Sequence, residues 1–208
     1  MRKVSRRIAR RVAATASTAM VAAVFAGGMA AAGVDSTSSI IDHDQRTIAA
    51  IESDTRIDSV PPLDSNPLTR EWFHSGRAGF KVSGDHDTDW HGHLTVGYMV
   101  GYPATLDGKL RLQYLTPGVE LEAGTDLKLD FYDLIPRLGL ELAVGFGPGI
   151  QTVECAGGDI SGAEGYIQMS GFHGAVTGAV GPVTIRPFVK VVSSSGDTVV
   201  TYGPTTTL

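Results

Sequence analysis

The sequence predicts an all-β protein with one short N-terminal helix and one unusually long β-hairpin. From Leu68 onward, short segments rich in Val, Ile and Thr stop at Gly, Pro or Asp, which is typical of strands joined by turns. Residues 109–114 (KLRLQY) and 124–131 (GTDLKLDF) alternate leucine with charged residues, the pattern of strands with one apolar and one polar face. A further hairpin is predicted near the C-terminus, where TIRPFVKVV and DTVVTYG flank residues 193–196.

Residues 1–32 have the layout of a secretory signal peptide, and we expect cleavage near Ala32. Six cations lie within residues 2–11, an Ala- and Val-rich stretch follows, and three alanines precede Gly33. Removing this segment removes six of the 17 cations and none of the 22 acidic residues, which leaves a net charge of about −11. That charge argues against nucleic acid as a partner and favours cations or small neutral solutes.

Residues 33–69 are expected to be polar and irregular, apart from the short helix. The stretch DQRTIAAIESDTRI would place Ile48, Ile51 and Ile57 on one broad helical face, and Pro61 and Pro62 would end it. Beyond residue 32 the sequence has no run of 18 apolar residues, so a transmembrane helix is not expected. Any insertion into a membrane would therefore use β-structure.

The long hairpin is predicted over residues 106–142, with Gly124 in a three-residue loop at its tip. This register places Leu110 opposite Leu138 and Leu106 opposite Leu142, and a bulge on each strand keeps the apolar residues on one face. The expected apolar, lipid-facing residues are Leu106, Leu110, Leu112, Tyr114, Val119, Leu121, Leu127, Leu129, Leu134, Leu138, Leu140 and Leu142.

The opposite face of this hairpin is charged, and the same register places Arg111 opposite Arg137 and Asp107 opposite Glu141. Like charges so close together are tolerated where water screens them, so this face is expected to contact water. The expected water-facing residues are Asp107, Lys109, Arg111, Gln113, Lys128, Arg137 and Glu141.

Strands of 17 residues extend about 55 Å, or about 40 Å along the axis of a barrel with tilted strands, which is enough to cross a membrane. Two strands alone would leave unpaired backbone groups in hydrocarbon, so several copies of the chain would have to close a ring. The pattern equally allows a secreted soluble β-sandwich that uses the hairpin as an arm to bind a partner. Residue patterns alone do not separate these two interpretations.

Six motifs occur in an order that resembles the MspA-type porins of mycolic-acid-containing bacteria. The motifs are PLTREWFHSGRA (67–78), LTVGYMVGYP (94–103), GPGIQ (147–151), SGAEG (161–165), RPF (186–188), and SSGD (194–197) followed by TYG (201–203). The resemblance covers residues 33–208. It implies a homo-octamer in the outer, mycolic-acid-containing membrane, through which small hydrophilic solutes diffuse with cations preferred.

The same resemblance implies a sandwich-like rim domain (33–105 and 143–208) and a transmembrane hairpin (106–142) that contributes to one central barrel. It places the pore constriction at the hairpin tip, where relatives carry a cluster of aspartates. Here only Glu122 keeps a carboxylate at such a position, and the neighbouring Glu120 and Asp126 are expected to add to it. Rings of carboxylates favour cations.

Catalytic residues, cofactor-binding residues and a metal site are not predicted. The histidines of DHDTDWHGH (85–93) are expected to lie in a polar loop rather than to bind a metal ion. Trp72 and Trp90 are expected in the core or at subunit contacts, and His74 and His173 as hydrogen-bonded structural residues. The single cysteine, Cys155, is expected as an inert thiol within a sheet, because no activating base lies beside it in the sequence.

Overall fold

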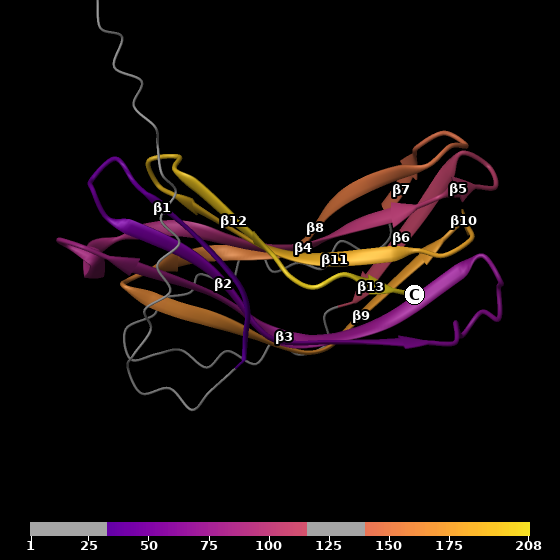
Figure 1. Ribbon diagram of the computed structural model, residues 1–208, viewed down its shortest axis with the longest axis horizontal. Coiled ribbons are helices and arrows are strands. Elements are labelled where there is room, and N and C mark those ends of the chain that lie inside the picture. Colours follow the sequence, from indigo (N-terminus) through magenta and orange to yellow (C-terminus); the bar gives the residue numbers. More distant parts are fainter. Residues whose placement is uncertain (1–32, 116–139) are drawn as a thin grey trace, which may run out of the picture. The chain divides into compact units, whose positions relative to one another are not determined.

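Two β-sheets packed face to face form the protein in the computed structural model, which describes residues 33–115 and 140–208 (Figure 1). The first sheet has six strands in the order β1-β2-β3-β9-β6-β7, and the second has the order β12-β11-β4-β8 with β13 beside β11. A short pair, β5 and β10, completes the strands of the described residues. The bounds are β1 (Val34–Ile41), β2 (Thr47–Val60), β3 (Thr69–Ser83), β4 (His91–Tyr102), β5 (Ala104–Thr105), β6 (Lys109–Leu115), β7 (Leu140–Ala143), β8 (Gly149–Ser161), β9 (Glu164–Thr177), β10 (Ala179–Val180), β11 (Thr184–Ser193), β12 (Thr198–Tyr202) and β13 (Thr206–Thr207).

The core lies between the two sheets and is built around two aromatic pairs. In one half Phe80 stacks on Trp90, with ring centroids 5.4 Å apart. In the other half Trp72 meets the edge of Tyr98 at 5.6 Å. The indole of Trp72 lies over Gly174, its partner on β9, and leaves no room for a side chain there. Both tryptophans are fully buried, which confirms the prediction that they contribute to the core.

The N-terminal segment is extended, so the predicted short helix is wrong. Residues 47–60 form β2, which pairs with β1 on one side and β3 on the other. Alternate residues of β2, Ile48, Ala50 and Glu52, are the most deeply buried, at 0–1% exposed. A bulge after Ser53 then shifts the register by one residue, so that Ile57 also packs on the core. Pairing on both edges outweighs the weak helical periodicity of this stretch.

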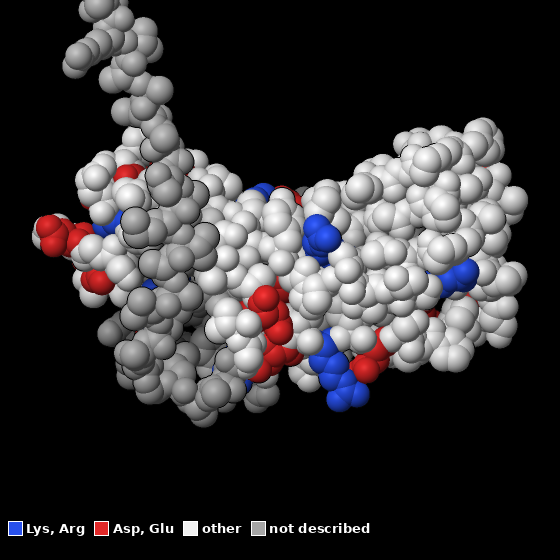
Figure 2. Space-filling model, viewed as in Figure 1, with Lys and Arg blue, Asp and Glu red and all other residues white. Residues whose placement is uncertain are grey.

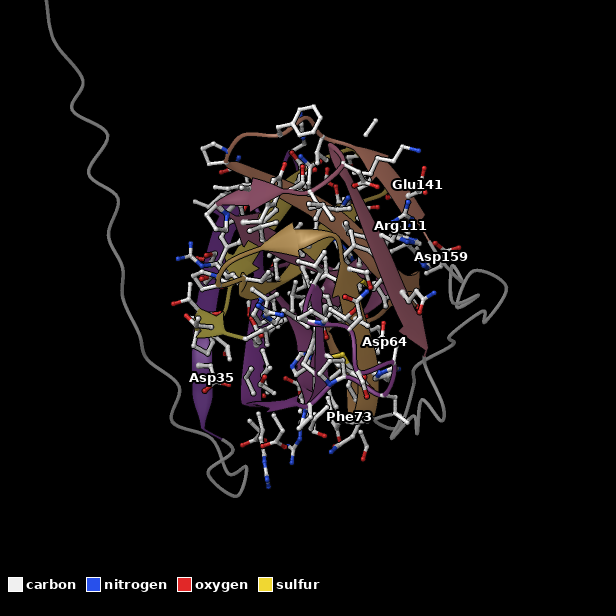
Figure 3. The ribbon with its side chains drawn as sticks, turned by 90° about the vertical axis from the view of Figure 1, so that its right-hand side faces the viewer. Asp35, Asp64, Phe73, Arg111, Glu141 and Asp159 are labelled. Carbon is white, nitrogen blue, oxygen red and sulfur yellow. The ribbon has the colours of Figure 1, made fainter. Side chains whose placement is uncertain are left out.

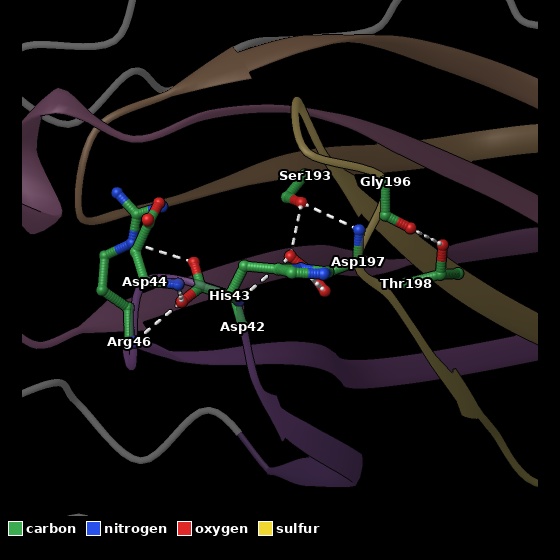
Figure 4. A network of polar contacts seen from close by, with 8 residues as sticks. All are labelled: Asp42, His43, Asp44, Arg46, Ser193, Gly196, Asp197 and Thr198. Atoms are coloured by element: carbon green, nitrogen blue, oxygen red, sulfur yellow. Dashed lines mark hydrogen bonds and ion pairs between the residues drawn. The ribbon is translucent and has the colours of Figure 1, made fainter.

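Val34–Ile41, within the part expected to be irregular, form the edge strand β1 of the six-stranded sheet. The turn that follows contains Asp42, which is 4% exposed and accepts hydrogen bonds from the backbone and the guanidinium of Arg46, both at 2.8 Å. The next residue, His43, contacts Asp197 at 2.6 Å (Figure 4). Since Asp197 lies in the turn between β11 and β12, this network joins the two sheets at one end.

The predicted C-terminal hairpin is confirmed. β11 and β12 pair from Val192 and Thr198 at the turn to Phe188 and Tyr202 at the far end. Gly196 takes a φ of 91° in the turn, a conformation that other residues rarely adopt.

Short helical structure in the described residues is limited to the 3₁₀ turn Asp87–Asp89, so those residues contain no helix long and apolar enough to cross a membrane. Charged residues are sparse on the face shown in Figure 2, where most of the surface is formed by uncharged residues.

Candidate functional site at the base of the hairpin

The base of the predicted long hairpin is formed by β6 and β7, which are part of the six-stranded sheet. β6 is hydrogen-bonded to β9 on one side, from Arg111–Thr177 to Leu115–His173, and to β7 on the other. Gly108, with a φ of 73°, turns the chain into β6, and its carbonyl accepts the backbone N–H of Val144 at 2.8 Å. The hairpin therefore starts from inside the sandwich rather than from a loop at its surface.

The two faces of β6 differ as the alternating pattern predicts. Leu110 and Leu112 point inward and are 0% and 4% exposed, in the same core cluster as Trp72. Arg111 and Gln113 point outward and are exposed. Leu110 and Leu112 therefore cover a protein core, and the expectation that these two leucines face lipid is corrected.

Four charged side chains form a cluster on the outward face. Glu141 of β7 accepts hydrogen bonds from Lys109 at 2.7 Å and from Arg111 at 3.0 Å. Glu141 and Arg111 are labelled in Figure 3. Arg111 also reaches Asp107 at 3.3 Å. Two acids and two bases balance one another, so this base cluster (Asp107, Lys109, Arg111 and Glu141) has no net charge. All four side chains remain about half exposed, where water and salt screen their attraction.

The register of the hairpin base differs from the predicted one by four residues. Leu110 lies opposite Leu142, not Leu138, and Arg111 lies opposite Glu141, not Arg137. A like-charged pair is thus replaced by an ion pair. Because four is an even number, the shift leaves every side chain of the base on the face predicted for it. The sequence signal that could have found this register is charge complementarity between facing residues.

Of the other expected apolar residues, Leu106 is 64% exposed and Leu142 packs partly against the core. The three residues of the expected constriction, Glu120, Glu122 and Asp126, lie outside the described residues. So do the water-facing Lys128 and Arg137 and the lipid-facing Val119, Leu121, Leu127, Leu129, Leu134 and Leu138. For Tyr114 and Leu140 the structure describes the backbone pairing alone.

The histidines His74, His93 and His173 contact other side chains within the sandwich, and Cys155 is buried. His74 contacts the hydroxyl of Tyr98 at 2.7 Å and His173 contacts Glu71 at 2.8 Å, which confirms their expected role. His93 contacts Asp159 at 2.8 Å across neighbouring strands. Burial raises the pKa of the Cys155 thiol to about 12, so the thiolate needed for nucleophilic attack does not form near neutral pH. Within residues 33–115 and 140–208, no three His, Cys, Asp or Glu side chains group together as metal ligands.

Fold and site together define a class of protein: a two-sheet β-sandwich in which two paired strands, β6 and β7, carry a charged cluster on their exposed side. Comparison with known proteins identifies the family. The MspA family model matches residues 44–207. The chain belongs to the MspA family, which places it among channel proteins rather than enzymes.

Three curated relatives from Mycolicibacterium smegmatis are similar over most of their length. Porin MspD is 40% identical over 82% of this chain and 86% of its own. Porin MspB is 39% identical over 89% of this chain and 93% of its own. Porin MspC is 38% identical over 98% of this chain and 97% of its own.

Proposed function

We propose that this chain is one subunit of an outer-membrane porin through which small hydrophilic solutes diffuse passively, with cations preferred. The observation that carries this proposal is the two-faced strand β6, whose polar side is exposed while its apolar side is held by the sandwich. The exposed side of such a strand can continue along the chain as the side of a hairpin that lines a water-filled pore. Membership in a family whose curated relatives are named porins supports the same conclusion.

The length of the chain between β6 and β7 suits a membrane crossing. Residues 109–115 are paired within the sandwich, so we assign the transmembrane hairpin to the 24 residues 116–139 instead of the whole of 106–142. Twenty-four residues suffice for a hairpin, since a β-strand needs about 9–11 residues to cross a bilayer. The rest of residues 33–208 forms the rim domain.

Acidic residues within this hairpin account for the proposed cation preference. The base cluster has no net charge, whereas residues 116–139 contain five acids and two bases. Each copy of the hairpin therefore carries a net charge of about −3, and a homo-octamer would carry about −24 in the pore. Carboxylate rings attract cations and repel anions at short range, so we place the selectivity at Glu122, with Glu120 and Asp126 beside it.

The alternating pattern places the apolar side of the hairpin against lipid. It places Lys128 and Arg137 on the side that faces the lumen. Arg or Lys at the middle of a bilayer costs about 2–4 kcal/mol, which favours the lumen for both residues. We further propose that residues 1–32 direct export, that the mature subunits assemble as homo-octamers in the mycolic-acid-containing outer membrane, and that the pore works without a cofactor.

Single-channel recording in a planar bilayer tests this function. Purified protein in detergent should form an oligomer and produce stepwise conductance, with a reversal potential in a KCl gradient that shows cation preference. Replacing Glu122 with Gln should lower the cation-to-anion permeability ratio more than replacing Asp107 with Asn, because Asp107 belongs to the neutral base cluster. A soluble monomer that makes no channels would instead support the secreted binding protein, and equal effects of the two substitutions would place the constriction elsewhere.

A further inference from the structure

An acidic side chain without a neutralising partner lies in the core between the two sheets. Glu52 of β2 is 1% exposed. One of its carboxylate oxygens, Oε1, accepts a hydrogen bond from the hydroxyl of Thr55 at 3.1 Å, whereas Oε2 has no hydrogen-bond partner among the described residues. A Cβ atom added to Gly203 would lie 2.5 Å from both oxygens, so the carboxyl group reaches the residues that follow β12. Burying such a group without a partner is unfavourable.

A second unpaired polar atom belongs to His74 of β3, which is 2% exposed. Its Nδ1 atom lies 2.7 Å from the hydroxyl oxygen of Tyr98. Its Nε2 atom has no partner among the described residues. An imidazole nitrogen can donate or accept, depending on the tautomer, so Nε2 can serve either an acid or a carboxylate.

Both side chains line one internal cavity of about 10 Å³, together with Tyr98, Cys155 and Phe172. A cavity of this size holds about one water molecule, and a buried water needs at least two polar partners. Glu52 and His74 supply two. Most of the other side chains that line the cavity are apolar, so the two unpaired atoms of Glu52 and His74 are what would hold a water molecule there.

We propose that this cavity holds a single water molecule that bridges Oε2 of Glu52 and Nε2 of His74. The water completes a hydrogen-bond chain from Glu52 through His74 to Tyr98. When Glu52 is protonated, its O–H donates to the water, the water donates to Nε2, and Nδ1–H donates to the hydroxyl of Tyr98. When Glu52 is ionised, Tyr98 donates to Nδ1, Nε2–H donates to the water, and the water donates to the carboxylate. In either direction the water gives Oε2 of Glu52 and Nε2 of His74 a hydrogen-bond partner.

The charges around the cavity decide which direction prevails. Burial raises the pKa of Glu52 to about 7, and the negative charge of Asp35 on β1 adds to the rise. Burial lowers the pKa of His74 to about 4. The other titratable groups that face the pair, Tyr98 of β4 and Cys155 of β8, have a pKa raised by burial and stay neutral near pH 6. Near pH 6, therefore, the folded protein keeps its proton on Glu52.

Between pH 4.5 and 6.5 the unfolded chain carries a proton on His74 and the folded protein carries one on Glu52. Folding therefore leaves the number of bound protons unchanged. The stabilisation from Glu52 is complete below its ordinary pKa of 4.5 and is lost as the pH rises to about 7. The stabilisation from His74 is complete above its ordinary pKa of 6.5 and is lost as the pH falls to about 4. Between pH 4.5 and 6.5 the two slopes are equal and opposite, so they cancel.

Separating the two residues by mutation tests the proposal. In full-length protein purified in detergent, Glu52→Gln should make the unfolding equilibrium constant fall by about tenfold per pH unit between pH 4.5 and 6.5, relative to the control. His74→Gln should make it rise by about tenfold per unit over the same range. The matched control is Glu154→Gln, an exposed glutamate paired with Lys190, which should keep the wild-type profile. If the unfolding equilibrium constants of the wild type and all three variants depend on pH in the same way, folding does not move a proton from His74 to Glu52.

Two measurements on the wild-type protein do not depend on whether these variants fold. Infrared spectra at pH 6 should contain the carbonyl band of one protonated, buried carboxyl group, and the band should disappear as the pH is raised past about 7. A crystal structure at high resolution should show one water molecule between Glu52 and His74. A missing band would overturn the protonation of Glu52, and an empty cavity would overturn the water.

Discussion

Replacing Leu110 with alanine tests most directly whether the apolar face of β6 packs on the core of the sandwich or faces lipid. A lipid-facing leucine would lose little when truncated, because the membrane still covers the site. In the structure Leu110 is 0% exposed and lies in the core cluster that contains Trp72 and Val176. Truncating a fully buried leucine removes its transfer free energy and leaves a cavity, which together cost about 2–5 kcal/mol.

We expect Leu110→Ala to lower the free energy of unfolding by about 3 kcal/mol, near the middle of that range. For a chain of this length, 1 kcal/mol corresponds to about 2–4 °C, so the thermal midpoint should fall by about 6–12 °C. Circular dichroism of the purified protein in detergent measures this midpoint. Protein and detergent concentrations have to be held constant, because assembly of subunits contributes to the apparent stability.

Leu106→Ala is the matched control, since Leu106 lies four residues earlier and is 64% exposed. It should change the midpoint by no more than about 2 °C, as surface substitutions usually cost less than about 0.5 kcal/mol. If the two variants lose the same small amount of stability, Leu110 does not contribute to a protein core, and its assignment to the sandwich fails.

Three further predictions concern the rest of the sandwich. Gly203→Ala should destabilise the protein by about 1–3 kcal/mol, because its Cβ would meet the carboxyl group of Glu52 at 2.5 Å. The control, measured by the same thermal midpoint, is Gly158→Ala, whose Cβ would have nothing within 4 Å. Cys155, 5% exposed and with a pKa of about 12, should react with a maleimide at pH 8 only after denaturation, as mass spectrometry would show; labelling of folded protein would contradict its burial. Burial alone would raise the pKa of Asp42, but hydrogen bonds from neighbouring residues outweigh it and lower the pKa below 3.8, so its stabilisation is present above pH 3.8 and lost on acidification. The Asn variant should therefore lose less stability than the wild type between pH 5 and pH 2, and an equal loss would exclude Asp42 as a source of acid sensitivity.

The sequence predicts those parts of the fold in which a local pattern and tertiary structure agree. The C-terminal hairpin has both strong strand residues and a turn with Gly196, and it forms where predicted. The alternation in β6 correctly separates Arg111 from its leucine neighbours. Local patterns do not show what covers a face, however, and the same alternation suits a leucine against lipid and a leucine against a second sheet.

Long-range pairing explains the predictions that failed. Residues 47–60 carry a weak helical pattern, but hydrogen bonds to β1 and β3 fix them as a strand. The predicted register of the long hairpin depends on the position of its tip. In the structure, pairing with β9 fixes one edge of β6, and ion pairs with Glu141 match β7 to the other edge. The burial of Glu52 follows from alternation along β2 and was hidden by the helical prediction.

The double pairing of β6 also has a mechanical consequence. β6 pairs with β7 from Lys109 to Leu112 and with β9 from Arg111 to Leu115, so bending it within the plane of the sheet would break backbone hydrogen bonds. The sandwich thus holds the start of the hairpin, on both edges at Arg111 and Leu112 and on the β9 edge as far as Leu115. In the proposed pore, thermal tilting of the body would be transmitted to the first residues of the barrel, so that entrance and rim move as one stiff unit.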